Sequence, residues 1–340
     1  MATPRLILTR AQILGFRRTV SALDERLPPG EDALRRAAWA GLQDSMPRAA
    51  LLSIHARVEG TSPTVVEHPS LVQLWGPRYS AYVVAERDRA VFTLGRLPHD
   101  GPGRRLAERT AASLDAYLAG RRMDHGPAGH AMGVHPNALR YGAPTGRILI
   151  RWDGARQPTI WTVPPPAIDP ADARVELARR HLHVFGPATA DSFAKWAGIK
   201  PETARATFEA LGDSLVPVET PIGEGWILRE DEVAFRVPPA DPAPARLLPS
   251  GDTYFLLQGP DRELLVPDGA RRAALWTSRV WPGAVLVEGE IVGTWRRAGP
   301  DVTIEPFGPL SAHARKAIEA EAASFPLPDR ERRIGVRWVE

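Results

Sequence analysis

One run of helix and strand signals, between residues 171 and 237, constrains the fold of this chain more than any other feature. Its pattern predicts three helices and two strands, over residues 171–185, 190–197, 201–212, 214–219 and 225–237. Thr189 is placed to cap the second helix, Gly198 to end it, and Pro201 to begin the third. Helix, helix, tight turn, helix and hairpin is the order of a winged helix, a variant of the helix-turn-helix.

The residues before this run contain two further units of similar plan. The first is predicted to contain helices at 9–23, 31–42, 47–58 and 69–75, with short strands at 79–84 and 90–94. The second is predicted to contain a helix at 104–122, a loop rich in Gly and His, a short helix at 136–141 and a hairpin at 147–163. We therefore expect three helix-plus-hairpin units in tandem.

The chain changes character after a Pro-rich linker at residues 238–244. Strand signals follow at 254–257, 263–266, 284–287, 290–297 and 302–306, and then a helix at 311–324 and a strand at 334–339. This pattern predicts a small β-barrel. The expected fold class is α+β, with three tandem winged-helix units followed by a small C-terminal β-barrel. The expected domains are residues 1–100, 101–168, 169–240 and 241–340.

Charge and composition narrow the function only partly. The net charge is +3, but the basic residues are almost all Arg, since Lys195, Lys200 and Lys316 are the only lysines. The planar fork of Arg matches phosphate, which favours nucleic-acid binding, although GC-rich coding produces the same excess. The chain has no Cys, which excludes disulfides, thiolate catalysis and Cys-ligated zinc. Residues 1–10 carry no secretory signal, and no apolar stretch approaches a membrane span, so we expect a cytoplasmic protein.

Several common catalytic motifs are absent from the sequence. It contains no phosphate-binding Gly-x4-Gly-Lys-Ser/Thr loop, no dinucleotide-binding Gly-x-Gly-x-x-Gly after a strand, no His-Glu-x-x-His and no Gly-x-Ser-x-Gly. His125, His130 and His135 lie five residues apart, a spacing that puts no two of them on one helical face. The sequence therefore predicts no metal site and no cofactor.

The third unit is a weak candidate for reading DNA. In a helix-turn-helix the second helix enters the major groove, and here that helix would be residues 201–212. It would expose one basic side chain, Arg205, and two acids, Glu202 and Glu209. The predicted hairpin at 147–163 is a better candidate because Arg147, Arg151 and Arg156 could contact phosphates. The alternative is that these arginines lie on a strand face that is exposed to solvent and does not contact DNA.

Several stretches resemble the family of tandem winged-helix proteins that includes the AlkZ/YcaQ-like bacterial DNA glycosylases. The resemblance extends from about residue 8 to residue 307. The matching stretches are Gly41-Leu42-Gln43, residues 47–52 with 56–57, 78–84, 145–150, 185–189, 193–198, 280–289 and 293–296. The resemblance implies a concave DNA-binding body that excises N-alkylated bases, including, in some members, bulky adducts or interstrand crosslinks.

The family's active-site signature is Gln-x-Gln or Gln-x-Asp, directly after the Gly-Leu pair. Gln43 falls on the first position and Ser45 on the second, so the chain departs from the signature. An N7-alkylated purine is a cationic leaving group, so the enzyme mainly positions water and stabilises an oxocarbenium-like sugar. A Gln carbonyl can do both, whereas a Ser hydroxyl is shorter and uncharged. Asp44 could substitute if the loop shifted, or Asp44 or Ser45 could cap the helix that begins near Pro47.

Other candidate residues could contact DNA or could have a structural role. The candidates for DNA contact are Arg48, Arg57, Arg78, Arg147, Arg151 and Arg156. Arg57 and Arg78 could instead be structural ion-pair partners. The candidates for a wedge between base pairs are Trp75, Trp152, Trp161 and Trp281, and each could instead belong to the core.

Together these features predict a monomeric, cofactor-free glycosylase that acts on alkylated purines in double-stranded DNA, with Gln43, Ser45 and Asp44 as catalytic candidates. Because of Ser45, a non-catalytic DNA-binding protein with a role in damage recognition or transcription is the main alternative. A protein-interaction scaffold that ignores DNA is a third.

Overall fold

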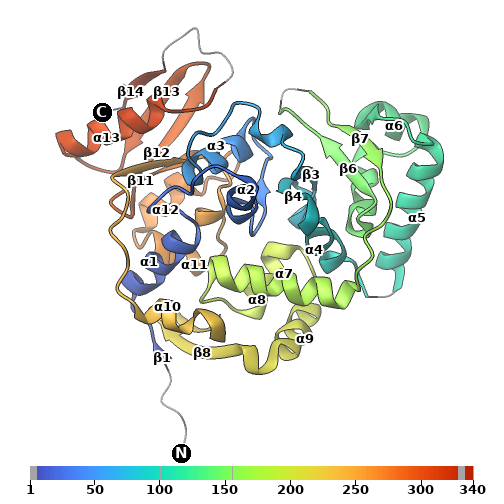
Figure 1. The fold of residues 1–340 in the computed structure, drawn as a ribbon, viewed down its shortest axis with the longest axis horizontal. Helices are drawn as coiled ribbons and strands as arrows, with labels where there is room; N and C mark the ends of the chain where they lie inside the picture. The colour runs from blue at the N-terminus through green and yellow to red at the C-terminus, as the bar shows by residue number, and fades with distance from the viewer. Residues whose placement is uncertain (1–5, 100, 155, 328–333, 340) are drawn as a thin grey trace, which may run out of the picture.

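The computed structural model describes residues 6–99, 101–154, 156–327 and 334–339. Up to residue 163, the helices and strands are β1 (Leu6–Ile7), α1 (Arg10–Val20), α2 (Glu31–Ala37), β2 (Leu42–Gln43), α3 (Ala49–Arg57), β3 (Leu71–Trp75), β4 (Ala81–Ala85), α4 (Arg89–Thr93), α5 (Gly101–Leu118), β5 (Met123–Asp124), α6 (His125–Ala131), β6 (Ile148–Arg151) and β7 (Thr159–Thr162). Figure 1 shows α2 and α3 near the centre of the view, with α5 and α6 at one side and α13 at the other.

The remaining elements form the third unit and the C-terminal part. They are α7 (Pro170–Phe185), α8 (Ala190–Ala197), α9 (Pro201–Leu211), β8 (Leu215–Thr220), β9 (Gly223–Leu228), α10 (Glu232–Arg236), β10 (Ala245–Leu248), α11 (Asp261–Leu265), α12 (Gly269–Leu275), β11 (Gly283–Val287), β12 (Glu290–Ala298), β13 (Asp301–Pro306), α13 (Ala312–Ala323) and β14 (Gly335–Trp338). The mixture of helices and antiparallel strands confirms the α+β class. None of the described helices combines the length and apolarity needed to cross a membrane.

A six-stranded sheet joins the first two expected units. Its order is β2-β4-β3-β6-β7-β5, so residues on both sides of the expected boundary at residue 100 pair with each other. The junction is antiparallel, with Gln73 of β3 opposite Ile150 of β6. On the other side, β2 pairs with β4 and places Gln43 opposite Tyr82. The sheet therefore brings the hairpin β6–β7 close to the candidate catalytic segment.

The third unit follows its sequence signals closely. Thr189 caps α8 in a capping box with Ser192, and Gly198 ends that helix with a left-handed backbone, φ 71°. The hairpin β8–β9 comes after α9, and β1 adds a third strand in parallel to β8. The predicted strand at 225–237 is wrong in its second half, because β9 ends at Leu228 and residues 232–236 form α10.

The C-terminal strands form an open sheet and not the predicted barrel. Their order is β10-β11-β12-β13-β14, and no pairing between β10 and β14 closes the sheet within the described residues. Helix α13 covers this sheet and shares an apolar core with it, including Leu247, Val285 and Ile318. One helix on one sheet face buries the apolar side chains without closure.

Short apolar runs account for several of the other wrong predictions. Residues 71–75 form the strand β3 and not a helix, whereas the predicted strands at 90–94 and 263–266 fall in helices α4 and α11. Residues 253–255 form a 3-10 turn where a strand was expected. The loop rich in His contains the helix α6. An apolar run of four to six residues is too short to show the hydrophobic periodicity that would distinguish a buried strand from a buried helix turn.

The first unit, the third unit and the C-terminal part share one large apolar core. It includes Leu14 from α1, Phe92 from α4, Leu182 from α7, Trp196 from α8 and Phe255 beside the C-terminal sheet. Because these side chains pack together, the segments that surround β2 and α3 are held in fixed positions.

Candidate active-site region

The candidate catalytic residues lie where β2 ends and α3 begins. Side chains alternate across a strand, so Leu42 and Asp44 point to one face of the sheet and Gln43 to the other. Leu42 is part of the apolar core around α2 and α3. Gln43 is paired with Tyr82 across β2 and β4, and cross-strand partners share a face. The three consecutive candidates therefore do not point into one site.

Asp44 caps helix α3. Its Oδ1 accepts a hydrogen bond from the Ala50 backbone N–H at 3.0 Å, which satisfies one of the unpaired amides of the first turn. The residue at the usual capping position, Arg48, makes no side-chain cap and has a left-handed backbone, φ 64°. Of the two residues expected to cap this helix, Asp44 or Ser45, the structure shows Asp44 in that role. Burial raises the Asp44 pKa from 3.8 to about 6, while the bonds from Ala50 and Gln73 and the nearby charge of Arg151 lower it.

Gln73 connects Asp44 to the β6–β7 hairpin. Its Nε2 donates to Asp44 Oδ2 at 2.6 Å and to the Trp152 carbonyl at 3.2 Å. Its Oε1 accepts from the Trp152 backbone N–H at 2.5 Å. One buried amide thus fixes the first residue after β6 against the start of α3. At the tip of the hairpin, Gly154 lies against Pro47, and a Cβ at this position would lie 2.6 Å from the Pro47 Cα atom.

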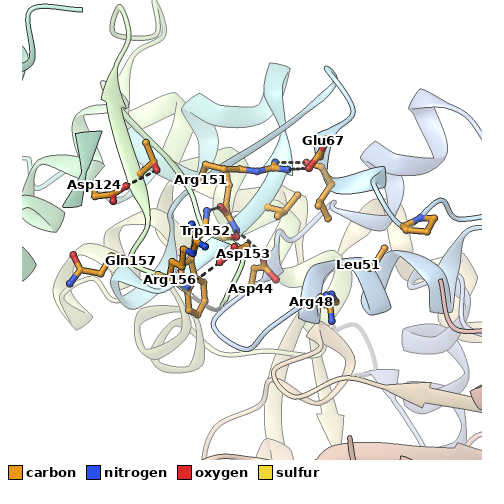
Figure 2. Close-up of a pocket in the computed structure, with 15 residues that line it drawn as sticks. Asp44, Arg48, Leu51, Glu67, Asp124, Arg151, Trp152, Asp153, Arg156 and Gln157 are labelled. Carbon is orange, nitrogen blue, oxygen red and sulfur yellow. Dashed lines mark hydrogen bonds and ion pairs between the residues drawn. The ribbon is translucent and has the colours of Figure 1, made fainter. Parts of the chain in front are cut away.

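A cavity of about 570 Å³ opens over the Asp44 face (Figure 2). Its lining includes Gln73 and Trp152, three arginines (Arg48, Arg151 and Arg156) and four acids (Asp44, Glu67, Asp124 and Asp153). Arg151 is paired with Glu67 at 2.6 Å. The structure therefore gathers three of the six arginines predicted to contact DNA, namely Arg48, Arg151 and Arg156, at the edge of one cavity.

Gln43 faces the C-terminal part of the chain. A Cβ placed on Gly251 would lie 3.4 Å from the Gln43 Cδ atom, so the amide packs against the turn that follows β10. The Gln43 Oε1 is buried and accepts no hydrogen bond from any described residue. Buried polar atoms in folded proteins almost always have a partner, so an acceptor left without one at this position needs an explanation.

Arg57 is a structural residue, which corrects its prediction as a DNA contact. Its guanidinium binds both oxygens of Asp252 at 2.7 Å, and its side chain is only 1% exposed. Ser53 Oγ donates to the same carboxylate at 2.6 Å. A fully buried, paired guanidinium cannot contact a phosphate. This ion pair instead holds the 249–253 turn, and with it Gly251, against α3.

The other predicted contacts lie elsewhere. Arg78 has a left-handed backbone, φ 54°, and lies against Gly198 at the end of α8. Arg147 is paired with Asp115 of α5 at 2.6 Å. Trp75 is 2% exposed and packs with the core of the second unit, so of its two expected roles, wedge or core, the structure shows the core. Trp161 and Trp281 are partly buried against the large apolar core.

A family model described as DNA glycosylase AlkZ-like matches residues 36–326. The chain belongs to the AlkZ-like DNA glycosylase family. Membership places it among DNA glycosylase-like repair proteins, and it confirms the resemblance read from the sequence. Residues 43–45 and the groups around them lie inside the matched region.

Two known proteins are similar to this chain. An interstrand DNA cross-link repair glycosylase from Streptomyces sahachiroi is 30% identical over 181 residues, which cover 50% of this chain and 47% of that protein. The chain thus spans about half the length of the curated relative that it matches. The solved structure of Streptomyces sahachiroi DNA glycosylase AlkZ has a TM-score of 0.79 at 17% identity, covering 98% of this chain and 100% of that one. At this identity the likeness shows the shared fold.

The sequence alone did not identify Gln73, Gly251 or Asp252. Gln73 lies in a segment that was predicted as a helix. The alternation of side chains along a strand, which directs Gln73 to the same face as Asp44, was therefore not considered. Gly251 and Asp252 follow β10, a strand that was not predicted, and they are about 200 residues from their partners. The polar Gln73 within the apolar run 71–75 was the one available signal.

The raised Asp44 pKa predicts a pH dependence of stability. Because the pKa is higher in the folded than in the unfolded state, protonated Asp44 favours folding below about pH 4, and this contribution is lost as the pH rises through 6. Relative to Asp44→Asn, we expect the wild type to lose about 2 kcal/mol of unfolding free energy between pH 4.5 and 7. Chemical denaturation of both proteins at the two pH values measures this difference.

The comparison with the variant is needed because other groups titrate in the same range. Burial lowers the pKa of His55 and of His181 to about 3, so these residues destabilise both proteins as the pH falls below 6.5. Their effect cancels in the difference. An equal pH dependence in the two proteins would contradict the raised pKa of Asp44.

Proposed function

We propose that this protein hydrolyses the N-glycosidic bond of alkylated purines in double-stranded DNA. Family membership across residues 36–326 supports the reaction class. The observation that carries the assignment of the site is the buried, unpartnered Oε1 of Gln43, which lies on the first position of the family signature. The duplex substrate, the monomeric state and the cytoplasmic location are part of the proposal.

Gln43 would orient the attacking water. Its carbonyl oxygen accepts a hydrogen bond from water, and its partial negative charge stabilises the positive charge that develops on the sugar. The backbone of Gln43 is fixed by pairing with Tyr82, and its side chain is fixed by Gly251, so the amide is positioned before substrate binds. Because the alkylated purine is already cationic, no strong acid is needed at the leaving group.

Ser45 and Asp44 have different parts in this proposal. Ser45 lies two residues beyond Gln43, and its hydroxyl can accept a second hydrogen bond from the water. Asp44 points to the opposite face, where it caps α3 and binds Gln73. We therefore assign Asp44 a positioning role: it holds the loop that carries Ser45. No residue in this set requires a cofactor.

DNA would approach along the arginines at the edge of the Asp44 cavity. Arg48, Arg151 and Arg156 are all exposed, and Arg151 is paired with Glu67. Guanidinium groups at this position can contact phosphates on either side of a lesion. The helix-plus-hairpin units would act as winged helices that shape this surface. Binding should therefore weaken with rising salt.

A non-catalytic role in damage recognition is the second candidate function. The observation that favours it is Ser45, which has neither the amide nor the carboxylate of the family signature. Duplex binding with no release of base would support this role.

Single-turnover release of N7-methylguanine from a duplex tests the proposal. Abasic sites are cleaved with alkali and resolved on a gel, and binding to the same duplex is measured in the same buffer. Release well above the spontaneous rate supports hydrolysis. Tight binding without release, for this lesion and for a bulkier N7 adduct, would favour the second candidate.

A further inference from the structure

A second hollow lies on the opposite side of the loop from the Asp44 cavity. It has a volume of about 260 Å³ and lies between the loop before α3 and the C-terminal sheet. Its lining is mostly apolar and includes Met46, Pro47, Leu52, Pro249, Val280, Trp281, Pro282 and Trp295. We call it the Trp281 groove. Pockets for drug-sized ligands measure roughly 300–1,000 Å³, so this groove fits one or two fused rings and not a whole molecule.

The groove begins beside the candidate catalytic residues. Met46, which lines it, directly follows Ser45. Ser250 also lines it and directly precedes Gly251, the residue against which the Gln43 amide packs. A group attached to a base at Gln43 could therefore extend into the groove without leaving the protein surface.

The apolar side chains in the groove are not all covered. Val280 is 46% exposed, although large aliphatic side chains are usually buried. Trp281 is partly buried and lies under the guanidinium of Arg262, at 5.3 Å from the ring centroid. Trp295 forms the floor, because it is 5% exposed and its Nε1 donates to the Leu248 carbonyl. The groove thus offers a flat apolar face with a fixed floor.

The charges around the groove match DNA. Arg296 and Arg297 line it, and none of the described residues in its lining is acidic. Burial lowers the pKa of Arg297, and the positive charge of Arg48 lowers it further. A basic rim around an apolar floor suits a ligand whose apolar part is attached to a polyanion.

We propose that the Trp281 groove binds the flat apolar body of an adduct carried by the purine, and that Val280 and Trp281 determine which lesions are released best. This inference rests on the proposed function, since it names the part of the substrate that lies beside Gln43. The arginines at the rim would hold the phosphates that flank the lesion. A methyl group would leave the groove empty, so it would gain nothing from these contacts.

Two substrates and four variants test the proposal. The substrates are duplexes with one N7-methylguanine or one N7-(1-naphthylmethyl)guanine, and the variants are Val280→Ser, Trp281→Ala, Trp281→Phe and Val233→Ser. Val233 is 71% exposed on α10, away from the groove, and is the matched control for Val280. Val280→Ser changes an exposed side chain, so it keeps the test valid if Trp281→Ala does not fold.

We expect Val280→Ser and Trp281→Ala to lower kcat/KM for the naphthylmethyl adduct about tenfold more than for N7-methylguanine, by loss of one apolar contact. Trp281→Phe should recover most of the difference, and Val233→Ser should show none. Equal losses on both substrates, or no loss on either, would overturn the proposal.

Binding distinguishes failure of this proposal from failure of the proposed function. If the wild type releases neither base, equilibrium binding to the naphthylmethyl duplex is compared with binding to the unmodified duplex. Preference for the adduct that Trp281→Ala and Val280→Ser remove would support the groove even without hydrolysis. Absence of any preference in the wild type would overturn it.

Discussion

Replacing Arg57 by Met is expected to lower the free energy of unfolding by about 3–5 kcal/mol, because it leaves the Asp252 carboxylate buried without its cation. The side chains of Arg57 and Asp252 are 1% and 0% exposed, so water cannot replace the lost partner. Ser53 and the Tyr254 amide still donate to Asp252, but neither carries a charge. The midpoint of chemical denaturation at pH 7 measures the change.

A surface ion pair provides the control for this prediction. Arg151 and Glu67 are 2.6 Å apart, but their side chains are 42% and 61% exposed. Arg151→Met should therefore cost less than about 1 kcal/mol. Combining Arg57→Met with Asp252→Leu should recover part of the loss, since no charge then remains buried. Equal small effects of Arg57→Met and Arg151→Met would show that the buried pair does not hold the 249–253 turn.

Replacing Gln43 by Ala is expected to lower the single-turnover rate of N7-methylguanine release by about 100-fold. The estimate corresponds to one positioned polar group that acts on the transition state. Binding to the duplex should change little, because the proposal assigns the phosphate contacts to arginines and Gln43 only to the attacking water. The rate is measured at saturating enzyme, so that a change in affinity does not enter it.

The control is another glutamine at a distance from the site. Gln258 is partly buried and lines a different pocket, near α8 and β9. Gln258→Ala should retain the wild-type rate. If Gln43→Ala also retains it, the buried Oε1 has no part in hydrolysis and the assignment of the site is wrong.

Local signals predicted the parts of the fold that depend on neighbouring residues. Thr189, Gly198 and Pro201 act at the ends of the helices on which they lie, and α8 and α9 begin and end within one residue of their predicted bounds. The strands of the hairpin β6–β7 were also correctly placed. Capping and turn formation are decided within a few residues, so the sequence carries the information directly.

The predictions that failed depend on partners far away in the chain. Residues 71–75 became a strand because β4 and β6 pair with them, and a short apolar run does not reveal such pairing. The barrel was inferred from the number of strands, whereas α13 covers the open sheet. Closure depends on whether the first and last strands meet, which no local pattern encodes.

The candidate site was located from the sequence but not resolved into its parts. The resemblance placed Gln43, Asp44 and Ser45 at the centre, and strand alternation separated them onto two faces once β2 was known. The role of Arg57 depended on Asp252, 195 residues further along the chain. Arginine alone does not distinguish a phosphate contact from a buried ion pair, because both use the same guanidinium.

The most direct test of the central claim compares base release by the wild type, Gln43→Ala and Asp44→Asn in one experiment. All three are assayed in single turnover on a duplex with one N7-methylguanine at pH 7.5, with folding checked by circular dichroism. We predict release by the wild type, a loss of about 100-fold in Gln43→Ala and less than tenfold in Asp44→Asn, because in this account Gln43, and not Asp44, faces the substrate. Retention of activity in Gln43→Ala together with its loss in Asp44→Asn would contradict the account and move catalysis to the Asp44 cavity.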